Sequence, residues 1–88
     1  MGGEVVSLDR IRTRRQLAER TSRLSDRELT VLAELARGLA TEEIALAMFL
    51  SPHTIRSHVK AAMRKLGAHT RAHAVAIALG GGAIDAAA

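Results

Sequence analysis

The chain has 88 residues, of which 48% are hydrophobic and 25% are charged, so it suits one small domain and leaves no room for a second. It has no Cys, which excludes disulfides, thiolate metal sites and a Cys nucleophile and makes a reducing cytoplasm the expected compartment. Its formal net charge of +4 favours an acidic partner. With one Phe and neither Tyr nor Trp, it lacks the aromatic platforms on which single-stranded nucleic acids stack, so duplex DNA is favoured over RNA.

Neither a membrane span nor a targeting signal is expected. The longest apolar run, residues 72–79, is interrupted by His73 and falls far short of the roughly 18 residues that suggest a membrane helix. The N-terminus has no basic segment that leads into an apolar stretch, and Val6 stands where a myristoylation signal needs Ser or Thr.

Charge is segregated along the chain. Residues 1–23 carry six Arg and three acids, and residues 24–50 carry two Arg and five acids. Residues 51–67 carry four basic residues and no acid, whereas residues 68–88 are balanced. We therefore expect the positive field to come from the N-terminal extension and from one internal segment.

The N-terminal extension has the composition of a helix over residues 8–22 but few apolar positions, which predicts either a marginal helix or a mobile arm. For its Arg residues, a solvated linker is favoured over an arm that lies on phosphates or in a minor groove. These residues are Arg10, Arg12, Arg14 and Arg15.

Start and stop signals predict four helices after the extension and almost no strand, so the expected fold class is all-α. The first helix begins at Ser25, which forms a capping box with Glu28, and ends at Gly38. The second is about two turns long and has Thr41 as its N-cap.

The third predicted helix has Ser51 as its cap and Pro52 at its first position, and it runs to about Leu66, where Gly67 stops it. The fourth has Thr70 as its cap and covers about residues 71–79.

A helical wheel separates residues 52–66 into two faces. One face is apolar and is expected to meet the core: Ile55, Val59, Ala62, Met63 and Leu66. The other carries cations and short hydrogen-bonding side chains with no acid among them: His53, Arg56, Ser57, Lys60 and Arg64. A face of this kind is typical either of a solvated surface or of a surface that binds a partner.

Residues 42–66 also have the layout of the unit that places a recognition helix in the DNA major groove, namely a short helix, a tight turn and a longer helix. Thr41 and Ser51 start the two helices, whose free amides can receive phosphate oxygens on either side of the groove. For Thr41, simple capping is an equally good explanation.

Several motifs follow one another at fixed spacing. They are Leu24-Ser25-x-Arg27-Glu28-x-x-Val31-Leu32-x-x-Leu35-Ala36-x-Gly38, Glu43-Ile44-Ala45, Leu50-Ser51-x-x-Thr54-Ile55-Arg56-x-His58-Val59 and Lys65-Leu66-Gly67. Over about residues 24–84 the chain thereby resembles the LuxR-type (LuxR/FixJ/GerE) helix-turn-helix domain of bacterial transcription regulators. The resemblance implies a four-helix domain whose third helix reads the major groove and whose fourth helix commonly forms the dimer contact.

The resemblance also implies roles for single residues. It implies base-edge contacts by Arg56, Ser57 and Lys60, and phosphate contacts around Thr54 and the helix caps. These residues and the others on the outward face of the third helix together make up the expected DNA-binding set. It consists of Thr41, Ser51, His53, Thr54, Arg56, Ser57, Lys60 and Arg64. The expected partner is double-stranded DNA with an inverted-repeat operator, bound by a homodimer that regulates transcription.

The chain departs from the family pattern at two places in its sequence and in its length. Thr70 and His73 stand where the family often has an Asn cap and a Glu or Gln, so the capping box of the last helix is expected to be weakened. His53 is mostly neutral at cytoplasmic pH, so its contribution to phosphate binding is expected to be small or pH dependent. Family members usually carry the domain behind a sensor, for which 88 residues leave no room, so we expect a stand-alone regulator or an effector domain of a longer one.

The last predicted helix is apolar nearly all round. A core stripe through Val75 and Leu79 leaves Ile77 and part of the Ala surface for self-association. The alternative is that the N-terminal extension or Ile84 covers this face. The predicted dimer-interface residues are Ala74, Ile77 and Ala78.

Metal binding and catalysis are not expected. His69 and His73 have the spacing of two ligands on one helix face, but no Cys and no converging carboxylate pair accompanies them. No nucleophile, base and orienting group can be placed together, so we predict no enzyme activity and no cofactor. His58, beside the core stripe, is expected to be packed and hydrogen-bonded.

Two alternatives stay open. A sigma-factor C-terminal helix-turn-helix has a similar Glu-Ile-Ala and Ser-x-x-Thr pattern, but the motif at residues 65–67, followed by another helix, favours the LuxR type. A protein-interaction module would keep the fold and hold another regulator through the last helix or the arm, against which the basic balance of residues 51–67 argues. RNA polymerase or another regulator is a further candidate partner. The predicted organisation is a basic extension or linker (1–23), the helix-turn-helix domain (24–84) and a tail (85–88).

Overall fold

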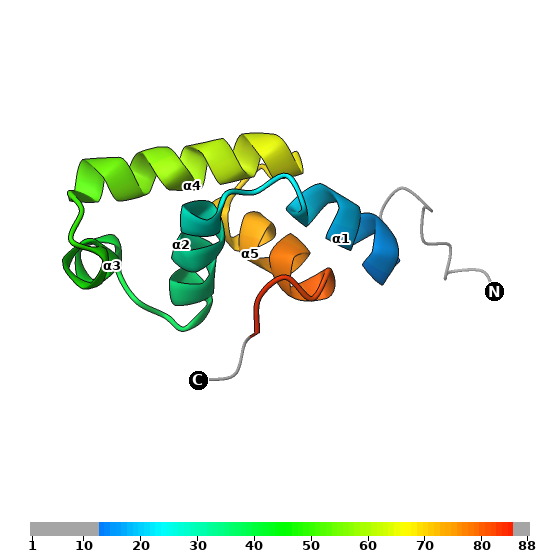
Figure 1. Cartoon of the computed structure of the whole chain (residues 1–88), viewed down its shortest axis with the longest axis horizontal. Helices are drawn as coiled ribbons and strands as arrows, with labels where there is room; N and C mark the ends of the chain where they lie inside the picture. Colours follow the sequence, from blue (N-terminus) through cyan, green and yellow to red (C-terminus); the bar gives the residue numbers. More distant parts are fainter. Residues whose placement is uncertain (1–12, 86–88) are drawn as a thin grey trace.

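The computed structural model describes residues 13–85, and all of the regular structure in this range is helical (Figure 1). The five helices are α1 (Arg14–Thr21), α2 (Asp26–Ala36), α3 (Thr41–Met48), α4 (Pro52–Leu66) and α5 (Arg71–Gly80). The predicted all-α fold class is confirmed. No helix between residues 13 and 85 is long and apolar enough to cross a membrane.

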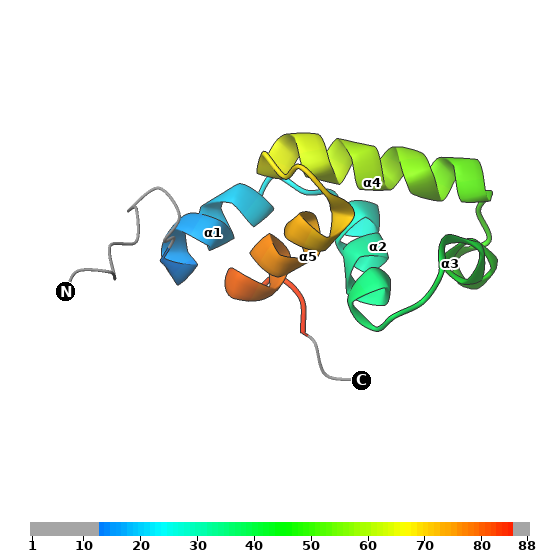
Figure 2. The same ribbon diagram turned by 180° about the vertical axis from the view of Figure 1, so that it is seen from behind.

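The longest helix, α4, is the element on which the others assemble. All four other helices contact it, with α3 near its N-terminal end and α1 near its C-terminal end (Figures 1 and 2). The apolar stripe predicted for this helix is confirmed, because Ile55, Val59, Ala62 and Leu66 are buried and Met63 is half-buried.

The core consists of two hydrophobic clusters that share α4. The first joins α2, α3 and the N-terminal half of α4 through Val31, Ile44, Ala45, Ile55 and Val59. The second joins α2, α5, the C-terminal half of α4 and the last described turn through Leu24, Leu32, Ala62, Leu66, Ala74, Ile77, Ala78 and Ile84.

Local signals set most helix ends where the sequence predicts them. The Ser25 hydroxyl accepts the Glu28 N–H at 3.1 Å while the Glu28 carboxylate accepts the Ser25 N–H at 2.8 Å, so the predicted capping box is confirmed. The Ser51 hydroxyl accepts the Thr54 N–H at 3.0 Å. Gly67 ends α4 in the left-handed conformation at φ 67°, which glycine adopts without steric cost.

The prediction that Thr41 caps α3 is wrong by one residue. The N-cap is Ala40, and Thr41 is the first helical residue. The helix starts earlier because the Glu43 carboxylate accepts the Ala40 N–H at 2.7 Å, which satisfies that donor without a capping hydroxyl. The Thr41 side chain is instead buried, at 8% exposure.

Of the two alternatives left open for the extension, the structure has a helix over Arg14–Thr21, with the rest of residues 8–22 outside it or outside the described range. Thr13 and Gln16 form a capping box, with N–H to oxygen distances of 3.1 and 2.9 Å. α1 packs on α5 and on the end of α4, and Leu17 joins the second hydrophobic cluster. Arg10 and Arg12 lie outside the described residues, and the division of the chain at residue 23 stays a prediction.

A glycine permits the close approach of α1 to the end of α5. A Cβ atom at Gly81 would lie 2.8 Å from the backbone nitrogen of Ala18 and 2.8 Å from the backbone carbonyl carbon of Leu17. Only a residue without a Cβ leaves room for that backbone. This contact fixes α1 against α5 in addition to the burial of Leu17.

A partly buried ion pair links α2 to the C-terminal end of α4. The Lys65 ammonium donates to the Glu28 carboxylate at 2.8 Å, and the Glu28 side chain is 7% exposed. Burial raises the pKa of Glu28, but the hydrogen bonds from Lys65 and from the Ser25 N–H, with the charge of Lys65, outweigh it, so its pKa is lowered overall. The ionised carboxylate therefore stabilises the fold.

We predict that Glu28→Gln lowers the free energy of unfolding by about 1.5–3 kcal/mol at about pH 7, because the amide loses a charge-assisted hydrogen bond. Since the pKa of Glu28 is lowered in the folded state, its stabilisation is complete above the ordinary carboxyl pKa and is lost as the pH falls through the lowered value. Denaturant unfolding at about pH 7 and about pH 3 measures both effects, and the gap between the two proteins should narrow in acid.

The matched control is Glu34→Gln, which removes the surface pair of Glu34 with Arg37 at 3.1 Å. We expect it to cost less than about 1 kcal/mol. A gap between Glu28→Gln and the unchanged chain that is the same at both pH values would contradict the prediction.

Candidate nucleic-acid interface

The face of α4 that points away from the core is exposed, as the helical wheel predicts. It carries three cationic side chains with a Ser and a His, and α4 contains no acid. The exposed residues are His53, Arg56, Ser57, Lys60 and Arg64. Such a face offers charge and hydrogen-bond donors to an external anion.

The N-terminal end of α4 adds hydroxyl groups to this face. The Ser51 and Thr54 hydroxyls lie 2.9 Å apart and form a hydrogen bond, and Ser51 is exposed whereas Thr54 is partly exposed. The start of the helix also carries the partial positive charge of the helix dipole. This end can therefore hold an anionic oxygen without a formal charge on the chain.

One acid of α3 approaches the basic face. The Glu42 carboxylate lies 3.8 Å from the Arg56 guanidinium, and both side chains are more than half exposed. Exposed pairs of this kind contribute at most about 1 kcal/mol, so Arg56 can exchange this partner for another anion. Within residues 13–85, Lys60 and Arg64 form no ion pair, so their charges are uncompensated there.

Thr41 does not join this face. Its hydroxyl lies 3.5 Å from a guanidinium nitrogen of Arg71 on α5, and its side chain is buried. A direct phosphate contact by the Thr41 hydroxyl would require this packing to open, so the structure separates Thr41 from the other residues predicted for the interface.

The residues predicted for the dimer interface lie inside the chain. Ala74 and Ala78 are fully buried and Ile77 is 5% exposed, so the prediction that Ile77 lies on an open face is wrong. Ile77 is buried because α1 packs on α5 and Ile84 folds back onto the same hydrophobic cluster. The alternative that the N-terminal extension or Ile84 covers this face therefore holds. The open side of α5 is instead formed by Ala72 and Ala76, with Val75 half-buried beside them.

The start of α5 keeps half of a capping box. The Thr70 hydroxyl accepts the His73 N–H at 3.0 Å, and the His73 ring accepts the His69 N–H at 3.3 Å instead of reaching back to the cap. The two imidazole rings stack with centroids 6.0 Å apart. Among residues 13–85, no three His, Cys, Asp or Glu side chains gather around a common point.

His58 is half-buried, as predicted from its place beside the core stripe. Its Nε2 atom is buried, but it has no hydrogen-bond partner within the described part of the chain. The predicted packing is confirmed and the predicted hydrogen bond is absent at this nitrogen.

Two exposed apolar residues were not singled out as surface features from the sequence. Leu46 on α3 is 79% exposed, and Phe49 in the turn before α4 is 94% exposed. Phe49 also has a left-handed backbone at φ 57°, which the sequence does not signal because that conformation favours Gly or Asn. The turn of the helix-turn-helix unit therefore presents an apolar side chain to the outside.

Known bacterial regulatory proteins have sequences similar to this chain. Residues 22–78 match the sequence model of bacterial regulatory proteins, luxR family. The chain is 37% identical over 81 residues to a nitrate/nitrite response regulator protein homolog of Haemophilus influenzae, and the match covers 85% of this chain and 38% of that protein. It is 47% identical over 57 residues to the HTH-type transcriptional activator RamA of Corynebacterium glutamicum, covering 65% of this chain and 20% of RamA.

A shorter relative is the spore germination protein GerE of Bacillus subtilis, which is 42% identical over 52 residues. That match covers 59% of this chain and 70% of GerE. The chain thus spans well under half of the first two relatives and most of the third. With about two thirds of its residues inside the family's sequence model, the chain belongs to the luxR family of bacterial regulatory proteins.

Proposed function

We propose that the chain binds specific sequences of duplex DNA in the cytoplasm and regulates transcription, with α4 in the major groove. The observation that carries this proposal is the exposed, acid-free face of α4 behind a short helix and a turn. Its cations release counterions from DNA, which supplies affinity, and its donors match base edges, which supplies specificity. The names of the relatives, among them a transcriptional activator, support the same class of function.

The proposed roles follow position on α4. Arg56 and Lys60 are suited to the two acceptors of guanine, and Ser57 between them to either kind of base. Ser51 and Thr54 at the start of the helix are suited to backbone phosphate, and so are the exposed residues His53 and Arg64, whose side chains carry nitrogen donors.

We further propose that two copies pair through the open side of α5. Ala72, Ala76 and the half-buried Val75 form an apolar surface there. A hollow beside it is lined by Ala72 and Val75 together with Arg71 of α5 and Leu35 and Ala36 of α2. Small side chains allow two copies of one helix to approach closely in a two-fold contact. We propose this surface as the dimer contact in place of Ile77, because the Ile77 side chain is buried in the core.

The alternative of a protein-interaction module has one observation in its favour. Leu46 and Phe49 form an exposed apolar spot on α3 and the following turn, which suits contact with another protein. This spot is small beside the basic face of α4, so DNA binding remains the proposed function, and RNA polymerase or another regulator is a candidate second partner.

The proposal predicts that the purified chain enriches defined sequences from a randomised duplex library at roughly 150 mM salt, where purely electrostatic binding is suppressed. An inverted repeat with half-sites about one helical turn apart is the expected product, because two copies related by a two-fold axis read two half-sites. Absence of any enriched sequence would favour the protein-interaction module instead.

Lys60→Ala should weaken binding to the enriched operator by about 1–3 kcal/mol and relax specificity at one base pair, because Lys60 lies in the middle of the exposed face. Fluorescence anisotropy on the operator and on single-base variants measures both effects. Arg15→Ala on α1 is the control for loss of one charge, since Arg15 is exposed and lies on a different helix. Equal weakening on every sequence would show that Lys60 contacts a phosphate.

Ala76→Glu should dissociate the dimer into monomers, because it places a charge in the proposed contact while leaving the core intact. Sedimentation of the chain with and without operator measures the assembly. Ala47→Glu, at an exposed position of α3, is the control and should sediment as the unchanged chain does. A charge at Ile77 would not serve, because it would unfold the second hydrophobic cluster. Unchanged association of Ala76→Glu would contradict the proposed interface.

A further inference from the structure

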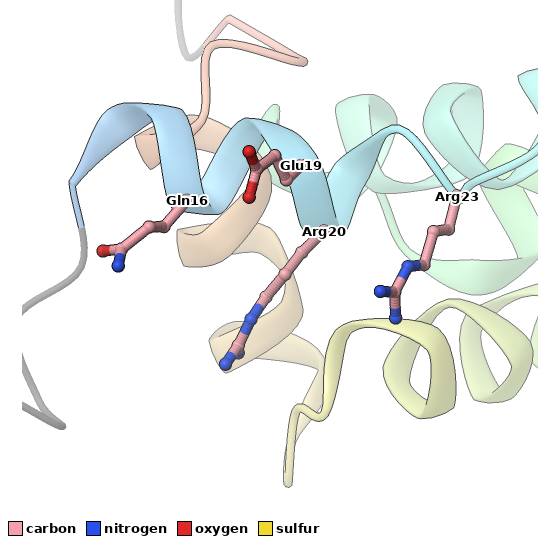
Figure 3. Close-up of a pocket in the computed structure, with 4 residues that line it drawn as sticks. All are labelled: Gln16, Glu19, Arg20 and Arg23. Atoms are coloured by element: carbon pink, nitrogen blue, oxygen red, sulfur yellow. The ribbon is translucent and has the colours of Figure 1, made fainter.

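Cationic side chains also gather at the C-terminal end of α4, where α1 packs against it. We call this surface the arginine hollow, and it is lined by Arg20, Arg23, Arg64, Lys65, Leu66 and Gly67. Figure 3 shows a neighbouring hollow, which shares Arg20 and Arg23 with this one and is also lined by Gln16 and Glu19. In this view Gln16 and Glu19 point away from the two arginine side chains. No acidic residue lines the hollow.

Arg20 holds the hollow in shape. One of its guanidinium nitrogens donates to the Leu66 carbonyl at 3.2 Å. This carbonyl belongs to the last turn of α4, where the helix dipole leaves partial negative charge and the carbonyls need outside donors. Arg20 therefore joins α1 to α4, and we assign it a positioning role.

The other cations differ in how far they are compensated. Lys65 is bound to the buried Glu28 at 2.8 Å, so its charge is paired. Arg23 and Arg64 are exposed, and between residues 13 and 85 neither forms an ion pair. Glu19, the acid of α1, lines a neighbouring hollow with Arg20 and Arg23, but the ion pair that it forms is with Arg15, at 3.8 Å. Two guanidinium groups beside a third repel one another, and a bound anion would lower that energy.

The length of α4 indicates which anion lies within reach. Its 15 residues span about 22 Å, whereas the DNA major groove is about 12 Å wide. In helix-turn-helix units the N-terminal residues of the recognition helix contact the base edges, so the C-terminal end of α4 would lie farther from the bases and nearer the phosphate backbone. Arg64 is one turn beyond Lys60 on the same face, so the hollow continues the surface that would face DNA.

We propose that Arg23 and Arg64 bind backbone phosphates beside the groove that α4 occupies, and that Arg20 positions this pair. The proposal rests on the proposed DNA-binding function, because it requires α4 in the groove. It goes beyond the family match, since α1 and Arg20 come before residues 22–78, and without α1 the hollow loses one wall.

The test compares the double variant Arg23→Ala with Arg64→Ala against the double variant Arg15→Ala with Arg37→Ala, which removes the same charge from exposed pairs elsewhere. The affinity of the 88-residue chain for a random-sequence duplex of about 24 base pairs and for the enriched operator is measured by anisotropy between roughly 50 and 200 mM salt. The hollow variant should reduce the slope of log affinity against log salt by about 2 for each bound copy, because about 0.9 is lost per phosphate contact and each copy loses two contacts.

Arg23→Lys with Arg64→Lys should recover most of the slope, because Lys retains the charge. The ratio of operator to random-sequence affinity should be unchanged in the hollow variant and reduced in Lys60→Ala. A slope equal to that of the control variant, with Lys60→Ala still losing specificity, would overturn this proposal and leave the proposed function standing.

Failure of the unchanged chain to bind either duplex would overturn the proposed function and this proposal together. A rise in melting temperature with inorganic pyrophosphate that requires Arg23 and Arg64, combined with an unchanged salt slope, would assign the hollow to a free anion and overturn the proposed phosphate contact. Circular dichroism of each variant checks that the exposed substitutions leave the helices intact.

Discussion

Every other helix of the described chain packs on the apolar stripe of α4, which divides its length between two hydrophobic clusters. Ile55 and Val59 serve the first cluster, and Ala62 and Leu66 serve the second. Burying a side chain of the Val, Ile or Leu size contributes about 1.5–3 kcal/mol, so this stripe holds α3 at one end and α1 and α5 at the other. The opposite face of α4 must then be exposed, and its cations are not explained by the stability of the fold.

Signals that act within one helix turn were sufficient to predict most of the helices. The capping box of Ser25 and Glu28, the start at Ser51 and Pro52, and the stop at Gly67 each depend on atoms at most four residues apart. The exposed face of α4 was predictable for the same reason, because a helical wheel needs only the helix bounds. For the candidate interface, the sequence therefore predicted which side chains lie on the exposed face of α4. It did not predict which of these side chains contact residues of other helices.

The predictions that failed depend on contacts between segments far apart in the chain. Ile77 is buried because α1 and Ile84 cover that side of α5, and a wheel of α5 alone cannot say which side is covered. Thr41 is not the cap of α3 because the Glu43 carboxylate accepts the N–H of Ala40, which places the N-cap one residue earlier. The Thr41 hydroxyl lies instead beside the Arg71 guanidinium. α1 itself is short and has few apolar residues, so its order depends on Leu17, on the close approach at Gly81 and on the hydrogen bond of Arg20 to α4.

The same long-range contacts redistribute the charge that the sequence assigns to residues 51–67. Glu28 pairs with Lys65 and Glu42 approaches Arg56, so two of the four cations of this segment face an acid from the preceding acidic segment. The uncompensated charge that remains runs along the exposed face from Lys60 to Arg64. There it meets Arg23, from a part of the chain that the charge pattern places in a separate segment. The uncompensated positive surface thus contains fewer cations of residues 51–67 than the sequence count indicates. It also extends beyond α4, because Arg23 contributes to it.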